Sequence, residues 1–143
     1  MNLLKSFVLL ALASTSLIAG AEAQGIIINQ PTAGTTLSQG VPFTVQISRP
    51  GNIEFAYEVG LAIGALACTS PCPDPESQIG DVLYTGPFDP EFHGPGEQYQ
   101  NFTVTIPEGV QTGSYQLGIL RFYLIGAGPS ATLNEYTVPV SVE

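Results

Sequence analysis

The sequence predicts an all-β protein, an immunoglobulin-like antiparallel β-sandwich of about seven strands. The chain of 143 residues is rich in Val, Ile, Thr, Tyr and Phe, and 16 Gly and 12 Pro interrupt it. That composition is typical of strands joined by turns. Apolar and polar residues alternate in several segments, and no segment has the clean period of an amphipathic helix. Strands at intervals of roughly 8–15 residues favour a sandwich, with a small barrel or a jelly roll as the alternative.

Met1–Ala23 has the three parts of a secretory signal peptide: a short charged start, an apolar run and a small-residue ending. The polar residues 14–16 break the apolar run, which is shorter than the roughly 20 apolar residues that span a bilayer. The final residues, Val138–Glu143, include no apolar tail of the kind that a lipid anchor requires. We therefore expect cleavage after Ala23 and secretion of Gln24–Glu143 as a single extracellular β-sandwich domain, without membrane insertion.

The first two predicted strands are each followed by a turn. Ile26–Asn29 is a short apolar strand, and Gln30–Gly34 has the composition of a turn. In Val41–Ser48 the odd positions are apolar from Val41 to Ile47, and the even positions from Thr44 onward are polar. Arg49–Asn52 then turns the chain.

Ile53–Ile63 is predicted as a strand with one buried and one solvated face. Every odd position is apolar, and the even positions hold Glu54, Ala56, Glu58, Gly60 and Ala62. A helix is the competing interpretation, but a period of two residues over the whole segment favours a strand. The pattern therefore places all the odd side chains in the core and the even ones on the outside.

Loops and strands alternate through the middle of the chain. Cys68–Gln78 is rich in proline and is predicted as a loop, and Ile79–Thr85 follows as a strand. Gly86–Gln98 is predicted as a second loop because it holds Gly, Pro and several acids. Tyr99–Ile106 alternates again and is predicted as the next strand.

The last two strands have different expected positions in a sheet. Ser114–Ile125 is apolar on both faces, as expected for a central strand that is covered on both sides. Tyr136–Val142 alternates to the end of the chain, but Pro139 has no N–H to donate to a sheet ladder. The final strand is therefore expected at an edge, or paired on one side only.

The charge of the chain argues against several kinds of partner. Asp and Glu number 12, and Lys and Arg only 3, which gives a formal net charge of -9. Nucleic acids and anionic membranes are bound mainly through Lys and Arg, so neither is expected as a partner. The chain has one His and no Trp. We expect a monomer that is not an enzyme, with no catalytic residues, no metal site and no cofactor.

The acidic loops and the single histidine have enzymatic or metal-binding alternatives. Six carboxylates crowd the two long loops: Asp74, Glu76, Asp81, Asp89, Glu91 and Glu97. Calcium or a glycosidase acid and base could use such groups, but prolines interrupt them and the regular spacing of an EF-hand is missing. A solvated acidic rim is the interpretation we prefer. His93 has no Gly-x-Ser-x-Gly nucleophile to serve, so we expect it on the surface.

Cys68 and Cys72 are the only cysteines and are predicted to form a disulfide. An even count in a secreted chain favours a bridge, and the short Pro-containing spacer keeps the two Cα atoms within bridging range. A redox-active pair is the alternative, but the spacing is not Cys-x-x-Cys and no flanking charge lowers a thiol pKa. A structural zinc site would need two more ligands, which His93 alone cannot supply.

Two further features concern the surface. Asn101-Phe102-Thr103 fits the rule for N-glycosylation, with an ordinary polar strand residue as the alternative. Most aromatic residues lie at strand positions and should be core. Phe88 and Phe92 instead lie in a Gly- and Pro-rich loop, where an exposed pair is a candidate contact patch.

The strand and turn residues of the second half carry a resemblance to a known family. They are Asp81–Phe88, Asn101–Gly109, Leu124–Ala127, Leu133 and Tyr136–Val138. This segment resembles the necrosis-inducing secreted protein family of fungal effectors. The resemblance implies a small secreted protein that is delivered into a plant host, causes cell death in leaves and suppresses pattern-triggered immunity by contacting receptor-associated immune kinases. The family has no catalytic residues to carry over.

Two readings of the function follow. We expect a secreted, non-enzymatic effector that binds a host protein, either outside the host cell or after uptake into it. The alternative is a cell-wall or carbohydrate-binding structural domain, because the Pro31-x-x-Gly34 and Leu37-x-x-Gly40 spacing also resembles other secreted fungal sandwich domains. Both readings predict an acidic surface, so charge does not separate them.

Overall fold

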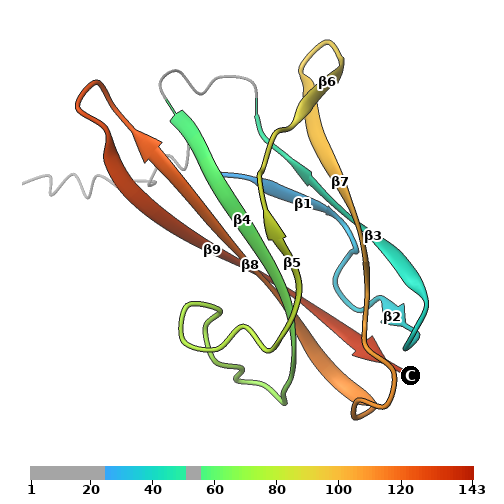
Figure 1. Ribbon diagram of the computed structural model, residues 1–143. Helices are drawn as coiled ribbons and strands as arrows, with labels where there is room; N and C mark the ends of the chain where they lie inside the picture. The colour runs from blue at the N-terminus through green and yellow to red at the C-terminus, as the bar shows by residue number, and fades with distance from the viewer. Residues whose placement is uncertain (1–24, 51–55) are drawn as a thin grey trace, which may run out of the picture.

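The computed structural model describes residues 25–50 and 56–143, which form nine strands and no helix (Figure 1). The predicted signal peptide and the predicted start of a strand at Ile53 lie outside the described residues. The strands are β1 (Ile27–Gln30), β2 (Thr36–Leu37), β3 (Pro42–Ser48), β4 (Ala56–Ala67), β5 (Asp81–Gly86), β6 (Glu91–Gly94), β7 (Glu97–Thr105), β8 (Gly113–Ile125) and β9 (Ser130–Val142).

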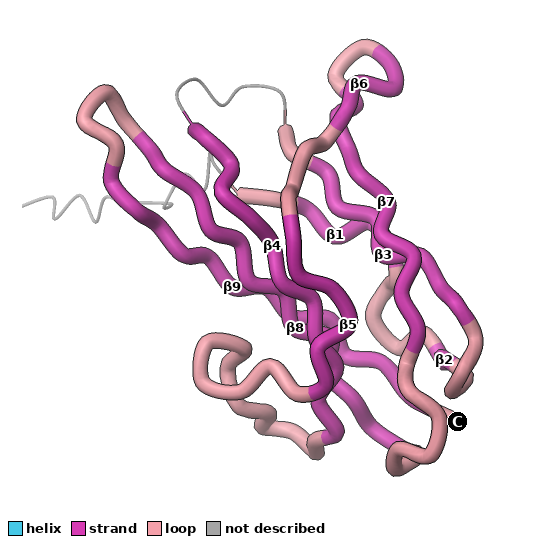
Figure 2. Tube along the Cα trace, in the orientation of Figure 1, coloured by secondary structure: helices cyan, strands magenta, loops and turns pink. Residues whose placement is uncertain are grey.

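The strands form two sheets, which confirms the predicted β-sandwich (Figure 2). The small sheet has the order β1-β3-β7-β6, and the large sheet has the order β2-β9-β8-β4-β5. All neighbours are antiparallel except β2 and β9, which are parallel at Thr36↔Ser141 and Leu37↔Val142. The chain changes sheets between β1 and β2, so its start contributes to both layers.

Two short strands account for the difference from the seven that the sequence predicts. β2 has only two residues, and β6 lies inside the predicted loop Gly86–Gln98. β6 pairs with the start of β7 through Glu91↔Tyr99 and Phe92↔Gln98. Its side chains are mostly exposed, so no alternation of apolar and polar residues marks it in the sequence. Backbone pairing, rather than burial, defines this strand.

The inner faces of the sheets form the core. Apolar side chains from both layers pack against one another, as in other aligned sandwiches. Among the described residues, the most deeply buried apolar side chains are Val45, Ile47, Ile63, Ile106, Leu117 and Ile119. β8 is the centre of the large sheet, with β4 on one side and β9 on the other.

The last strand is longer than predicted, and it is not an edge strand, because it lies between β2 and β8. β9 begins at Ser130 rather than Tyr136, and it pairs with β8 along its whole length. On its other side it pairs with β2 only at Ser141 and Val142. The carbonyl oxygen of Pro139 accepts a hydrogen bond from the Gly34 N–H at 2.8 Å. The N–H that proline lacks would therefore point away from β8, where its loss leaves the main ladder intact.

Among the described residues, no helix is long and apolar enough to cross a bilayer.

Candidate partner-binding surface

A β-bulge in β4 sets which of its side chains face outward. Glu58 is opposite Tyr123 on β8, and Gly60 is opposite Phe122, so Val59 is an extra residue in the ladder. A single inserted residue moves every side chain before it to the other face of the sheet.

The bulge overturns part of the predicted pattern. After it, Leu61 and Ile63 are buried as predicted. Before it, Tyr57 and Val59 are each 61% exposed, and the Glu58 side chain is 8% exposed. The prediction that all the odd positions face the core is therefore wrong for Tyr57 and Val59, and Glu58 lies on the inner side.

Glu58 is the centre of a buried charge cluster. Arg121 on β8 is fully buried; its Nε donates to Oε2 of Glu58 at 2.9 Å, and its Nη2 donates to Oε1. The guanidinium also stacks over the ring of Tyr123, with 4.1 Å from Cζ to the ring centroid. Burial alone would lower the pKa of Arg121, but the hydrogen bonds and attraction of Glu58 outweigh it, and the pKa is raised. Arg121 therefore stays charged in this buried position.

Arg49 connects this cluster to the small sheet. Its Nη1 donates to Oε1 of Glu58 at 3.3 Å, and its Nε donates to Oε1 of the buried Gln98 on β7 at 3.2 Å. Gln98 in turn donates to the carbonyl oxygen of Pro90 at 3.0 Å. Hydrogen-bonded charges thus join the two sheets at the end where β4 begins, and they give the outer face a rigid base.

Apolar side chains are exposed on the outer face above this cluster. We call Tyr57, Val59, Phe122, Leu124 and Leu133 the apolar patch. Phe122 is 42% exposed, and it lies between Gly60 on β4 and Leu133 on β9. A groove of about 260 Å³ runs across it, lined by Val59, Phe122, Tyr123, Leu124, Ala131, Thr132 and Leu133. A contiguous exposed apolar surface of this kind marks an interaction site in many proteins.

The other end of the same face is covered by the chain itself. Figure 1 shows the β8–β9 hairpin and the loop after β4 at opposite ends of the large sheet. A Cβ added at Gly64 would lie 2.5 Å from the carbonyl oxygen of Ile79, and one added at Gly118 would lie 3.1 Å from Pro75. The loop therefore lies directly on the glycines of β4 and β8. The prediction that β8 is covered on both sides is correct at this end and wrong at Phe122.

The covering loop is held by polar contacts and by the predicted disulfide. Cys68 and Cys72 are bonded, with an S–S distance of 2.08 Å and Cα atoms 5.6 Å apart. The Gln116 side chain on β8 donates to the carbonyl oxygen of Pro73 at 2.8 Å. The Glu76 N–H donates to Oε2 of Glu135 on β9 at 3.1 Å.

We expect the double variant Cys68→Ala/Cys72→Ala to lose about 2 kcal/mol of unfolding free energy, because the closed loop is short. The contacts of Pro73 and Glu76 should keep the loop docked. Urea unfolding measures the loss, and reduction of the parent protein should raise its intact mass by about 2 Da, for two added hydrogens. A loss above about 4 kcal/mol would mean that the bridge holds the fold, contrary to this expectation.

The predicted contact pair Phe88 and Phe92 is not a patch. Phe92 on β6 is 74% exposed, but Phe88 is buried in the core, with its ring centroid 6.4 Å from that of Phe102. The turn before it is fixed by the Tyr84 hydroxyl, which donates to the carbonyl oxygen of Pro87 at 2.7 Å. The expectation of an exposed pair is therefore wrong, because this loop folds inward between β5 and β6.

The other predicted polar sites lie on the surface and apart from the patch. His93 stacks on Tyr99 with ring centroids 3.7 Å apart. The six loop carboxylates are exposed. Within the described residues, no group of three or more His, Cys, Asp or Glu side chains is placed to hold a metal ion.

Asn101 lies on the outer face of the small sheet, which is polar. It accepts a hydrogen bond from Gln46 at 2.9 Å, and Gln46 accepts one from Asn29 at 3.1 Å, so three strands are joined by amide side chains. Asn101 is exposed. A glycan at this position would shield the small sheet and leave the outer face of the large sheet free.

We expect peptide N-glycosidase digestion to lower the mass of the protein secreted by a eukaryotic host. The variant Thr103→Ala keeps Asn101 but lacks the threonine that the glycosylation motif requires, so its mass should not change on digestion. An unaltered mass of the parent protein would dismiss the glycan.

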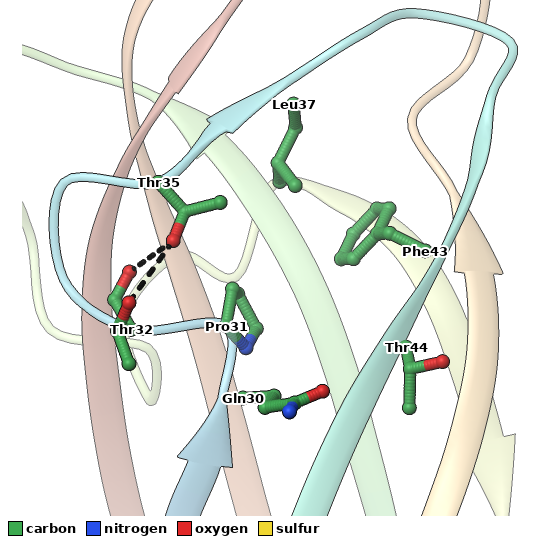
Figure 3. A pocket seen from close by; sticks show the side chains of 7 residues that line it. All are labelled: Gln30, Pro31, Thr32, Thr35, Leu37, Phe43 and Thr44. Carbon is green, nitrogen blue, oxygen red and sulfur yellow. Dashed lines mark hydrogen bonds between the residues drawn. The ribbon is translucent and has the colours of Figure 1, made fainter.

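A pocket of about 340 Å³ opens beside the turn between β1 and β2 (Figure 3). Its polar groups serve the turn itself: the Thr35 hydroxyl donates to the carbonyl oxygen of Thr32 at 2.7 Å, and the two hydroxyls are 3.3 Å apart. Leu37 and Phe43 supply its apolar wall. The pocket thus offers no convergent reactive groups.

Comparison with known proteins identifies the family. The Nis1 family model matches residues 23–141. The chain belongs to the Nis1 family. Its sequence is 29% identical over 136 residues to necrosis-inducing secreted protein 1 of Colletotrichum orbiculare, covering 94% of this chain and 77% of that protein. The predicted family is therefore confirmed.

Among solved structures, the backbone of this Nis1 family member matches in part the fibronectin(III)-like modules of CbhA from Clostridium thermocellum. The match has a TM-score of 0.38 and 13% identity, and it covers 82% of this chain and 94% of that chain.

The sequence does not predict the apolar patch as a site. Its members belong to segments that alternate or are wholly apolar, so the sequence assigns them to the core. One signal was present: Phe122-Tyr123-Leu124 places bulky residues on both faces of β8, and only one of those faces lies against the other sheet.

Proposed function

We propose that this protein is a secreted fungal effector that binds a host protein through the apolar patch. Membership of the Nis1 family carries the proposal, together with the name of its relative, a necrosis-inducing secreted protein. In this proposal the host protein is a receptor-associated immune kinase. Its capture suppresses pattern-triggered immunity, and prolonged capture leads to cell death.

The surface chemistry supports binding rather than catalysis. The patch is apolar and rests on the rigid Glu58 cluster. Both arginines of the described residues contact Glu58, and the formal net charge of the chain is -9. The exposed carboxylate of Glu135 lies two residues from Leu133 of the patch on the same strand. Such a surface favours a partner with an apolar contact region and a basic rim, and it accelerates their encounter at low salt.

The direct test is expression of the full chain, with its own leader, in leaves. We expect a weaker oxidative burst after an elicitor than in leaves that express an inert secreted sandwich domain. Affinity capture from the same leaves should recover a receptor-associated kinase. A normal burst together with sedimentation of the protein on insoluble chitin or glucan would contradict the proposal and favour a wall-binding domain.

A second comparison locates the action. A chain that starts at Gln24 stays inside the leaf cell, whereas the full chain is exported. Suppression by the exported protein alone would place the partner outside the cell, and suppression by both forms would place it within reach of the cytosol.

A further inference from the structure

β9 has a long free edge beside the apolar patch. It pairs with β8 from Ser130 to Val142, but β2 covers its other side only at Ser141 and Val142. The stretch from Ser130 to Val138 therefore has no strand neighbour on that side among the described residues. Figure 2 shows this stretch running to the β8–β9 hairpin at the border of the large sheet.

The hydrogen bonds near the end of β9 show which peptide groups point outward. The Ser141 N–H donates to the Thr35 carbonyl at 2.9 Å, and the Glu143 N–H donates to the Leu37 carbonyl at 3.0 Å. Odd residues thus direct their N–H and C=O groups away from β8. Because the direction repeats every second residue, the same holds for Ala131, Leu133, Glu135 and Thr137.

The other edges are less suited to an added strand. β1 and β6 have four residues each. β5 has six and begins with the carboxylate of Asp81. The free part of β9 is longer, and its outward side chains Ala131 and Leu133 line the groove of the apolar patch. An added strand would therefore gain both backbone hydrogen bonds and apolar contacts.

We propose that the free edge of β9 binds an extended segment of the partner protein, which joins the large sheet as a further strand. On the face of the large sheet that holds Leu133 and Glu135, the segment would place apolar side chains beside Leu133 and a basic side chain beside Glu135, two residues further along. This inference rests on the proposed function, because it names how the partner is held.

Charge selects this occupant over a second copy of the chain. The formal net charge is -9, so two copies repel each other. Antiparallel pairing of two β9 edges around Glu135 would also place the two Glu135 carboxylates opposite each other, which is unfavourable across a sheet. A cationic segment meets neither obstacle.

Amide hydrogen exchange tests the edge directly. The probe is a peptide of about ten residues that carries valine at the positions facing Ala131 and Leu133 and lysine at the same-face position nearest Glu135. We expect the amides of Ala131, Leu133, Glu135 and Thr137 to exchange at least ~10-fold more slowly with the peptide bound. The even residues already bond to β8 and should not change. The same peptide with N-methyl groups along its bonding edge should give no protection. Equal exchange at the odd amides with saturating peptide would overturn the proposal.

Proline at an odd position removes one outward N–H, and Pro139 shows that β9 accepts this change. We expect Leu133→Pro to weaken peptide binding and burst suppression about tenfold relative to Leu133→Ala, which keeps the N–H. Circular dichroism verifies the fold, and Thr137→Pro replaces Leu133→Pro if that variant is unfolded. Equal binding by the proline and alanine variants would refute strand addition.

The two proposals can fail separately. Normal suppression by a proline variant that has lost peptide binding would reject the edge as the partner site and leave the effector function standing. Edge protection by the peptide, with no suppression by the parent protein, would reject the function alone.

Discussion

Replacing Glu58 with leucine should lower the free energy of unfolding by about 3–5 kcal/mol, because it leaves the buried guanidinium of Arg121 without its carboxylate. Water cannot replace the lost carboxylate, because the Arg121 side chain has no contact with solvent. A domain of this size has only about 5–15 kcal/mol of stability. The variant should therefore unfold at a clearly lower urea concentration.

Matched variants separate the buried pair from its surface neighbour. Arg121→Met should cost less than Glu58→Leu, because Glu58 keeps Arg49 as a partner. Arg49→Met should cost about 1 kcal/mol or less, since the Arg49 side chain is 22% exposed. The double variant Glu58→Leu/Arg121→Met should recover most of the loss, because no buried charge remains. Equal losses for Arg49→Met and Glu58→Leu would contradict this order.

The predictable part of the fold is the part in which burial alternates along the strand. The predicted strands Val41–Ser48 and Tyr99–Ile106 match β3 and β7 to within two residues at each end, because one face of each strand lies against the other sheet. Val41 is the exception, since it precedes β3 and is exposed. The family was predictable as well, from strand and turn residues of the second half. Strands defined by backbone pairing alone, such as β6, carry no such pattern.

The bulge explains why the site was not predictable. Val59 and Gly60 both fit a regular strand, so nothing in the sequence marks the inserted residue. Apolar and polar residues continue to alternate in the sequence across the bulge, but the side chains change faces there. The sequence pattern therefore assigns Tyr57 and Val59 to the core. The disulfide was predictable from spacing, whereas the loop it closes covers glycines of distant strands, a contact that only the tertiary structure reveals.

Replacing Phe122 with lysine should abolish burst suppression in leaves and raise the partner's Kd by about 30-fold or more, as expected for the centre of an interface. Phe122 lies in the middle of the apolar patch, and a basic partner rim would repel the new charge. The unfolding free energy should change by only about 1 kcal/mol, because the side chain is already 42% exposed.

Two controls accompany this variant: a negative charge at the same position, and the same positive charge on the other sheet. Phe122→Glu loses the same ring but adds a charge that a basic rim attracts, so it should retain more suppression than Phe122→Lys. Thr44→Lys places the same charge on the exposed outer face of the small sheet, and it should suppress the burst like the parent protein. Equal loss in Thr44→Lys and Phe122→Lys would show that net charge decides binding, and undiminished suppression by Phe122→Lys would remove the apolar patch as the binding surface.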